Sequence, residues 1–124
     1  MLTKEMSKAK KVTLFYNPRC SKCREAYDIL NGQGCEVEII EYLKDTPNET
    51  ELKTVLKKLG LKPQELLRKK EPLFAEKYKD KKLTDGQWLK VMVKNPILIE
   101  RPVALYGNKA VIGRPVERVV EILG

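Results

Sequence analysis

A strand pattern that runs directly into a Cys-x-x-Cys and an amphipathic helix is the feature that most restricts the fold of this chain. Residues 12–16 are mostly β-branched and aromatic, as in a buried strand, and Asn17-Pro18 ends the run. Apolar residues recur on one helical face over residues 21–30, and a second strand pattern covers residues 37–40. Strand, helix and strand in this order predict a right-handed βαβ unit with parallel strands.

The middle of the chain carries start and end signals for helices. Two segments have the pattern of a capping box, and glycine or an Asn-Pro pair follows the apolar periodicity. The start signals are Thr46-Pro47-Asn48-Glu49, Pro63 and Thr84-Asp85-Gly86-Gln87, and the end signals are Gly60 and Asn95-Pro96. The short helix expected from Pro63 includes Arg68. We therefore predict a helical insertion over about residues 46–95.

The C-terminal third returns to strands. Gly107-Asn108 separates two apolar runs, residues 103–106 and 109–112, and this is a strong signal for a two-residue hairpin. Arg114-Pro115 then opens a last helix. The residues of this helix that we expect to face the core are Val116, Val119, Val120 and Leu123.

These parts combine into one fold. A βαβ unit, a helical insertion and a ββα unit make a four-stranded mixed sheet with helices packed against it, which is the α/β, thioredoxin-like layout. We predict a single domain over residues 12–124, preceded by a flexible lead-in at residues 1–11.

Cys20 lies at the expected junction between the first strand and the first helix. Unpaired N–H groups at a helix N-terminus favour a thiolate, and Arg19, Lys22 and Arg24 add positive charge. Cysteines in such settings have pKa values of roughly 3.5–7.5 instead of about 8.5. We therefore predict that Cys20 is the nucleophile and the more exposed thiol, while Cys23, one turn on, is the candidate resolving thiol.

Other interpretations of the cysteines remain open. Cys23 is also compatible with a small core residue without a redox role, and we interpret Cys35 as structural. Zinc needs a full tetrahedral set of ligands, and this chain has no histidine, so we expect no metal. The absence of histidine also excludes Ser-His-Asp and Cys-His triads.

Composition points to a reducing compartment. Three cysteines are an odd number, so they cannot form a closed disulfide framework, and we expect a cytoplasmic protein. We find no apolar run of about 18 residues and therefore expect no membrane association. The net charge is +8, but we interpret the basic residues, especially residues 77–82, as an ordinary solvated face and expect no nucleic-acid partner.

Four further segments resemble motifs of the glutaredoxin-linked arsenate reductase family, in the family's order and spacing. The resemblance covers nearly everything from Val12 to Gly124. The segments are Asn17-Pro18-Arg19-Cys20, Leu66-Leu67-Arg68-Lys69-Lys70-Glu71-Pro72, Asn95-Pro96-Ile97-Leu98-Ile99-Glu100-Arg101-Pro102-Val103 and Ile112-Gly113-Arg114-Pro115.

The resemblance implies a set of roles. In this family a thiolate attacks arsenate and three arginines bind the oxyanion, which here implies Cys20 as nucleophile and Arg68, Arg101 and Arg114 as ligands. Arginine suits this task because its planar fork donates several hydrogen bonds to a tetrahedral oxyanion. The resemblance also implies a cis peptide between Arg101 and Pro102.

Two positions depart from the family pattern. Tyr16 stands where well-studied members carry a histidine that favours the thiolate, and Cys23 stands where many members carry serine. A second thiol there resembles the Spx-type transcription regulators, which share the fold. Arg114-Pro115 after a glycine, and the Leu66-to-Lys69 block, favour the reductase side.

The resemblance thus implies a thiol-dependent oxidoreductase that reduces arsenate or a related oxyanion, without a bound cofactor. Thiol from glutathione or from Cys23 releases the reduced product, and glutathione or glutaredoxin is the expected reductant. Two alternatives stay open: a redox-switched regulator that binds RNA polymerase, and a general glutathione-linked thiol-disulfide oxidoreductase.

Overall fold

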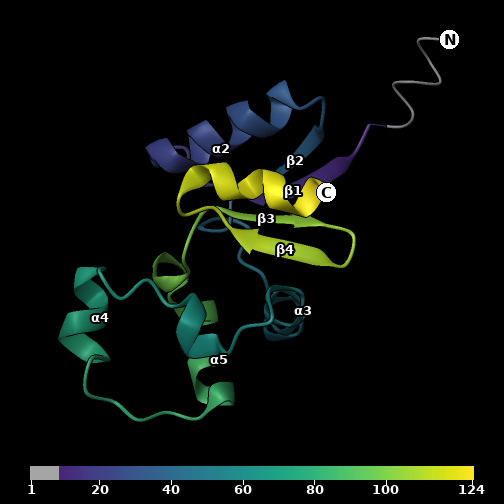
Figure 1. Ribbon diagram of the computed structural model, residues 1–124. Helices are drawn as coiled ribbons and strands as arrows, with labels where there is room; N and C mark the ends of the chain where they lie inside the picture. Colours follow the sequence, from purple (N-terminus) through teal and green to yellow (C-terminus); the bar gives the residue numbers. More distant parts are fainter. Residues whose placement is uncertain (1–8) are drawn as a thin grey trace, which may run out of the picture. The chain divides into compact units, whose positions relative to one another are not determined.

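The computed structural model describes residues 9–124 of the chain (Figure 1). The described residues form two compact units, one made of residues 9–41 and Arg101–Gly124, the other of Tyr42–Glu100. The second unit contains the segment expected as a helical insertion. Residues 1–8 of the expected lead-in lie outside the described residues, and the first strand already begins at Lys11.

The first unit is built on a four-stranded mixed sheet with the strand order β2-β1-β3-β4. β1 pairs in parallel with β2, and the pairs β1–β3 and β3–β4 are antiparallel. This sheet confirms the predicted α/β, thioredoxin-like fold class, and the hairpin strands have the predicted bounds. The strands are β1 (Lys11–Phe15), β2 (Glu36–Ile40), β3 (Val103–Tyr106) and β4 (Lys109–Ile112).

Two helices of the first unit cover one face of the sheet. α2 (Ser21–Gly32) and the 3-10 helix η3 (Val116–Leu123) pack against each other, and the yellow η3 lies beside α2 in Figure 1. Alternate residues of β1 point toward these helices, and Val12 and Leu14 are fully buried in the shared core. The core therefore holds the start of α2 next to the end of β1.

The last helix differs from the prediction in its buried face. We expected Val120 and Leu123 in the core, but both are only partly buried, and Val116, Val119 and Ile122 are the buried residues. The reason is that η3 is a 3-10 helix, which has about three residues per turn, so positions i, i+3 and i+6 share one face. The sequence prediction assumed the α-helical period.

The second unit is helical. α5 (Asp85–Lys94) packs against the other helices through the buried side chains of Trp88, Leu89 and Met92. The Trp88 ring also contacts two further aromatic rings, with centroid distances of 6.3 Å to Phe74 and 6.1 Å to Tyr78. The other elements are α3 (Glu49–Leu59), η1 (Pro63–Leu66), α4 (Pro72–Lys77) and η2 (Pro96–Leu98).

One of the two predicted capping boxes is wrong by two residues. α3 is capped by Asn48, whose Oδ1 accepts the Glu51 N–H at 2.8 Å while Glu51 Oε1 accepts the Asn48 N–H at 3.0 Å. Thr46, the expected cap, instead donates its hydroxyl to the Tyr42 carbonyl at 2.9 Å. Both positions have a glutamate three residues later, so the pattern alone does not choose between them.

The second capping box is confirmed. The Thr84 hydroxyl accepts the Gln87 N–H at 3.2 Å, and Gln87 Oε1 accepts the Thr84 N–H at 2.8 Å. Gly60 ends α3 in the left-handed conformation, with φ of 69°. Among residues 9–124, none of the helices has the length and apolar character needed to span a membrane.

Candidate active site

A tight turn places Cys20 at the start of α2. The Asn17 side-chain oxygen accepts the Arg19 N–H at 3.0 Å, and the Asn17 carbonyl accepts the Cys20 N–H at 2.9 Å. Cys20 is the N-cap residue, with an extended backbone, and its carbonyl accepts the first helical hydrogen bond, from the Arg24 N–H at 3.2 Å. The sulfur therefore lies where the first-turn N–H groups of α2 are unpaired.

The structure lowers the pKa of Cys20 below its ordinary value. Burial of the side chain, of which 8% is exposed, raises the pKa, but the opposing causes are stronger. They are hydrogen bonding from the backbone N–H and the thiol of Cys23, the positive charge of Arg101 and the N–H of Lys22. These groups lower the pKa because they stabilise the negative charge of the thiolate more than the neutral thiol.

The charges that act on Cys20 differ from those expected from the sequence. The Lys22 ammonium pairs with Glu25 at 3.2 Å, and Arg24 donates to the Pro18 carbonyl at 2.7 Å. Lys22 contributes to the lowered pKa through its backbone N–H, and the cation that contributes is Arg101, from the far end of the chain. The resemblance gave Arg101 as an oxyanion ligand, but sequence reasoning missed its effect on the thiol.

Cys23 is a buried neutral thiol beside Cys20. Its side chain is 0% exposed, and its pKa is raised to about 12, with burial as the largest cause. The hydrogen bond to Cys20 and the negative charge of Cys20 also raise the pKa, while hydrogen bonding to the Asn17 backbone and the Arg101 charge lower it. Cys20 is thus the more exposed of the two thiols, as predicted.

Two arginines flank the hairpin of β3 and β4 in the same unit. Arg101 precedes β3, and its peptide bond to Pro102 is cis, as the resemblance implies. Arg114 follows β4 and also precedes a cis proline, Pro115, which the sequence analysis did not predict. Arg114 Nε donates to the Arg101 carbonyl at 2.8 Å, so the two arginines are held together where the hairpin begins and ends.

Arg68 belongs to the second unit. The short helix predicted to include it ends at Leu66, and Arg68 follows a β-bridge between Leu67 and Ile99. Its backbone N–H donates to the Leu98 carbonyl at 2.7 Å, and its guanidinium pairs with Glu71 at 3.1 Å. The first unit thus brings together Cys20, Cys23, Arg101 and Arg114, and a role for Arg68 beside them stays a prediction.

Comparison with known proteins decides the family. The sequence model of the ArsC family matches residues 15–122, which include the thiols and all three arginines. The chain belongs to the ArsC family. Among relatives, the arsenate reductase of Neisseria meningitidis is 37% identical and the uncharacterized protein YfgD of Escherichia coli is 42% identical. These alignments cover 90% and 93% of this chain, and 97% and 98% of the relatives.

Solved structures support the ArsC family assignment. The structure of an arsenate reductase from Vibrio cholerae is 38% identical in sequence and has a TM-score of 0.88. The match covers 93% of this chain and 99% of the Vibrio chain. The fold of this chain is therefore shared with a protein of that name.

The third cysteine of this ArsC-family chain has a structural environment. Cys35 is 8% exposed and lies in the core cluster of the first unit. Burial raises its pKa, and the Lys10 charge only partly opposes this. Across residues 9–124, no three His, Cys, Asp or Glu side chains are grouped so that they could hold a metal ion.

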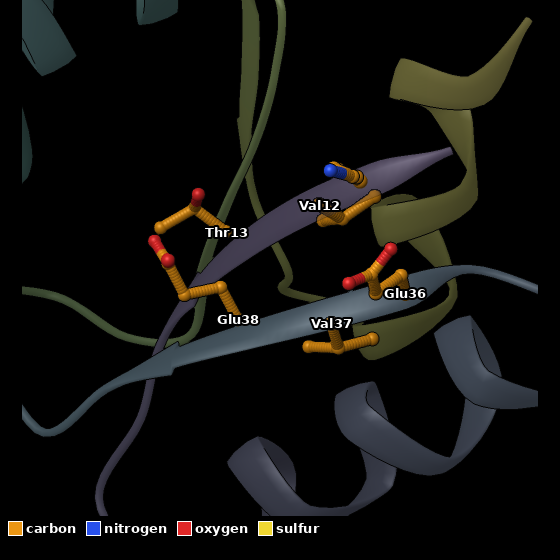
Figure 2. A pocket seen from close by; sticks show the side chains of 6 residues that line it. Val12, Thr13, Glu36, Val37 and Glu38 are labelled. Atoms are coloured by element: carbon orange, nitrogen blue, oxygen red, sulfur yellow. The ribbon is translucent and has the colours of Figure 1, made fainter. Parts of the chain in front are cut away.

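A pocket also lies along β1 and β2. Figure 2 shows Thr13 of β1 next to Glu38 of β2, and these two residues are paired in the sheet register. The lining residues are Lys11, Val12, Thr13, Glu36, Val37 and Glu38. None of them is a nucleophilic thiol or an arginine, so the chemistry that the ArsC family suggests belongs to the start of α2.

Proposed function

We propose that this ArsC-family chain is an enzyme that reduces arsenate by thiol chemistry, with Cys20 as its nucleophile. One observation carries the proposal: Cys20 lies at the N-terminus of α2 with a lowered pKa, under the influence of the Arg101 charge. Relatives named arsenate reductase that match nearly the whole chain support the choice of substrate.

In the first step the Cys20 thiolate attacks arsenic. A sulfur–arsenic bond forms, one arsenic–oxygen bond breaks, and the departing oxygen takes up protons and leaves as water. We propose that Arg101 and Arg114 bind the oxyanion, because forked guanidinium donors match its oxygens and stabilise charge that develops in the transition state. Arg68 is the proposed third ligand, on the strength of its family motif.

In the second step a thiolate attacks the Cys20 sulfur. A disulfide forms, the sulfur–arsenic bond breaks, and its electron pair stays on arsenic, so that arsenic(V) becomes arsenic(III) and leaves as arsenite. We propose glutathione or glutaredoxin as the ultimate source of the electrons. The need for reduced thiols also leads us to propose the cytoplasm as the compartment.

The test is arsenate-dependent NADPH oxidation with glutathione, glutaredoxin and glutathione reductase present. We expect turnover by the wild-type chain and none by Cys20→Ser, because serine is a far weaker nucleophile at neutral pH. Cys35→Ala is the matched control, since Cys35 lies in the core, and we expect it to keep wild-type turnover. Wild-type rates at background, both in this assay and with thioredoxin, thioredoxin reductase and NADPH, would overturn the proposal.

A further inference from the structure

Cys20 and Cys23 face each other across the first turn of α2. Cys20 is the N-cap and Cys23 is the third helical residue, and the Cys23 thiol hydrogen-bonds to Cys20. Two cysteines one helical turn apart are within the range that a disulfide bridges. Cys35, by contrast, lies in the hydrophobic core with Leu30 and Val12.

We propose that Cys23 is the thiol that releases arsenite and that a dithiol protein, rather than glutathione itself, then regenerates the enzyme. This inference rests on the proposed function above. The Cys23 sulfur attacks the Cys20 sulfur, the Cys20–arsenic bond breaks, and the electron pair stays on arsenic. The Cys23 proton passes to an oxygen of the departing arsenite, so two protein thiols supply both electrons.

The order of the two steps follows from the charges around Cys23. While Cys20 is a thiolate, its charge and its hydrogen bond keep Cys23 protonated, so Cys23 does not compete for arsenate. Once the Cys20 sulfur is bonded to arsenic, that charge is gone. Burial still raises the pKa of Cys23, but the Asn17 backbone and the Arg101 charge lower it and are no longer opposed by the charge of Cys20. Cys23 therefore loses its proton more readily after Cys20 has reacted than before.

Proximity favours Cys23 over an external thiol. Well-oriented intramolecular reactions reach effective concentrations on the order of 10⁵ M or more, far above any cellular thiol. In addition, Cys23 is 0% exposed and hydrogen-bonded to Cys20, so it needs no approach from solvent to reach the Cys20 sulfur. After arsenite has left, the enzyme therefore carries a Cys20–Cys23 disulfide instead of a glutathione adduct.

A disulfide of this kind selects its reductant. A monothiol that attacks Cys20 forms a mixed disulfide, and the adjacent Cys23 reverses it by expelling the monothiol. A dithiol protein completes the exchange, because its second thiol breaks the mixed disulfide before Cys23 does. The partner class is therefore a dithiol oxidoreductase such as thioredoxin or a dithiol glutaredoxin.

A single-turnover experiment tests the role of Cys23. Fully reduced protein, freed of reductant, is mixed with excess arsenate without oxygen. We expect one arsenite per wild-type chain, loss of two thiols and a Cys20–Cys23 disulfide in peptide maps. Cys23→Ser should form no arsenite until glutathione is added, whereas Cys35→Ala, the matched control, should behave as the wild type does.

The outcomes separate this inference from the proposed function. Wild-type chain that forms arsenite only after glutathione is added overturns the role of Cys23 and leaves arsenate reduction intact. Absence of arsenite with and without glutathione overturns the proposed function. Because the decisive measurement uses the wild-type chain, a folding defect in Cys23→Ser does not affect it.

A steady-state experiment tests the partner class. With thioredoxin, thioredoxin reductase and NADPH, wild-type turnover should be on the order of tenfold or more faster than with glutathione and glutathione reductase at equal thiol concentration. Cys23→Ser should reverse this preference, because its glutathione adduct has no neighbouring thiol to expel it. Equal wild-type rates with the two reductants would overturn the dithiol assignment.

Discussion

Arg114 Nε donates a hydrogen bond to the carbonyl oxygen of Arg101 at 2.8 Å. The bond joins the residue that enters β3 to the residue that leaves β4, and the Gly113 N–H reinforces it by donating to the Pro102 carbonyl at 2.8 Å. Arg101 in turn lowers the pKa of Cys20. The two bonds thus hold the backbone of Arg101, the residue whose charge favours the thiolate.

The arginine fork gives the first prediction. Arg101→Lys and Arg114→Lys keep the positive charge but lose the paired N–H donors, and each charge-assisted hydrogen bond contributes about 1.5–3 kcal/mol. We expect kcat/KM for arsenate to fall about tenfold or more in each variant. Arg118→Lys is the control, because Arg118 is exposed and paired with Glu121. Unchanged kinetics in the first two variants would contradict the proposed roles.

The role of Arg68 needs its own test, because Arg68 lies in the second unit and is paired with Glu71. If it is the third oxyanion ligand, Arg68→Lys lowers kcat/KM for arsenate by about tenfold, for the same loss of forked donors. The thiol reactivity of Cys20 should stay as in the wild type. If kcat/KM for arsenate falls no more in Arg68→Lys than in the Arg118→Lys control, Arg68 does not bind the oxyanion.

The third prediction concerns the pH dependence of Cys20. The thiolate is the form that alkylates, so the rate of Cys20 labelling by iodoacetamide rises as pH passes upward through its pKa. We expect the midpoint below the ordinary value of about 8.5. Arg101→Gln should move the midpoint to higher pH, because it removes a positive charge that stabilises the thiolate. Peptide mass spectrometry at each pH separates Cys20 from Cys35, and Arg118→Gln, which should leave the midpoint in place, is the control.

Gly113 gives a prediction about stability. A Cβ at this position would lie 2.8 Å from Val119 Cγ1 and 2.9 Å from Pro102 Cγ, and neither group is a flexible side-chain end. We expect Gly113→Ala to lower the free energy of unfolding by about 1–3 kcal/mol. Gly86→Ala is the control: Gly86 lies in α5, a Cβ there would meet no other part of the molecule within 4 Å, and the change should stabilise the fold by up to about 1 kcal/mol. Equal changes in the free energy of unfolding for the two variants, measured by urea denaturation, would contradict the close packing around Gly113.

Local sequence determined the elements whose signals lie within a few residues. Gly107-Asn108 fixed the hairpin, because Gly107 adopts a φ of 59° that side chains with a Cβ disfavour, and the observed strands have the predicted bounds. The Asn17-Pro18 break and the following helix placed Cys20 at the N-cap. The fold class followed from the order of these elements.

Where the local sequence allows two cap residues or two helix types, only the tertiary structure shows which one forms. Thr46 and Asn48 both precede a glutamate by three residues, and in the structure Asn48 caps the helix while the Thr46 hydroxyl donates to the Tyr42 carbonyl. Residues 116–123 have apolar side chains that suit either helical period, and the core accepts the 3-10 form. The pattern of apolar residues alone does not determine which helical form packs best, because that depends on the shape of the core against which the helix lies.

The electrostatics of the thiol site depended most on the tertiary structure. The sequence identified Cys20 from its local setting, but the cation that lowers its pKa is Arg101 and not Arg19 or Arg24. Likewise, the sequence left the role of Cys23 open, and burial now makes it a neutral thiol in contact with Cys20. Secondary structure follows from interactions within a few residues, whereas a pKa follows from burial and from charges nearby in space. Pairing of strands from distant segments determines both the burial and the nearby charges.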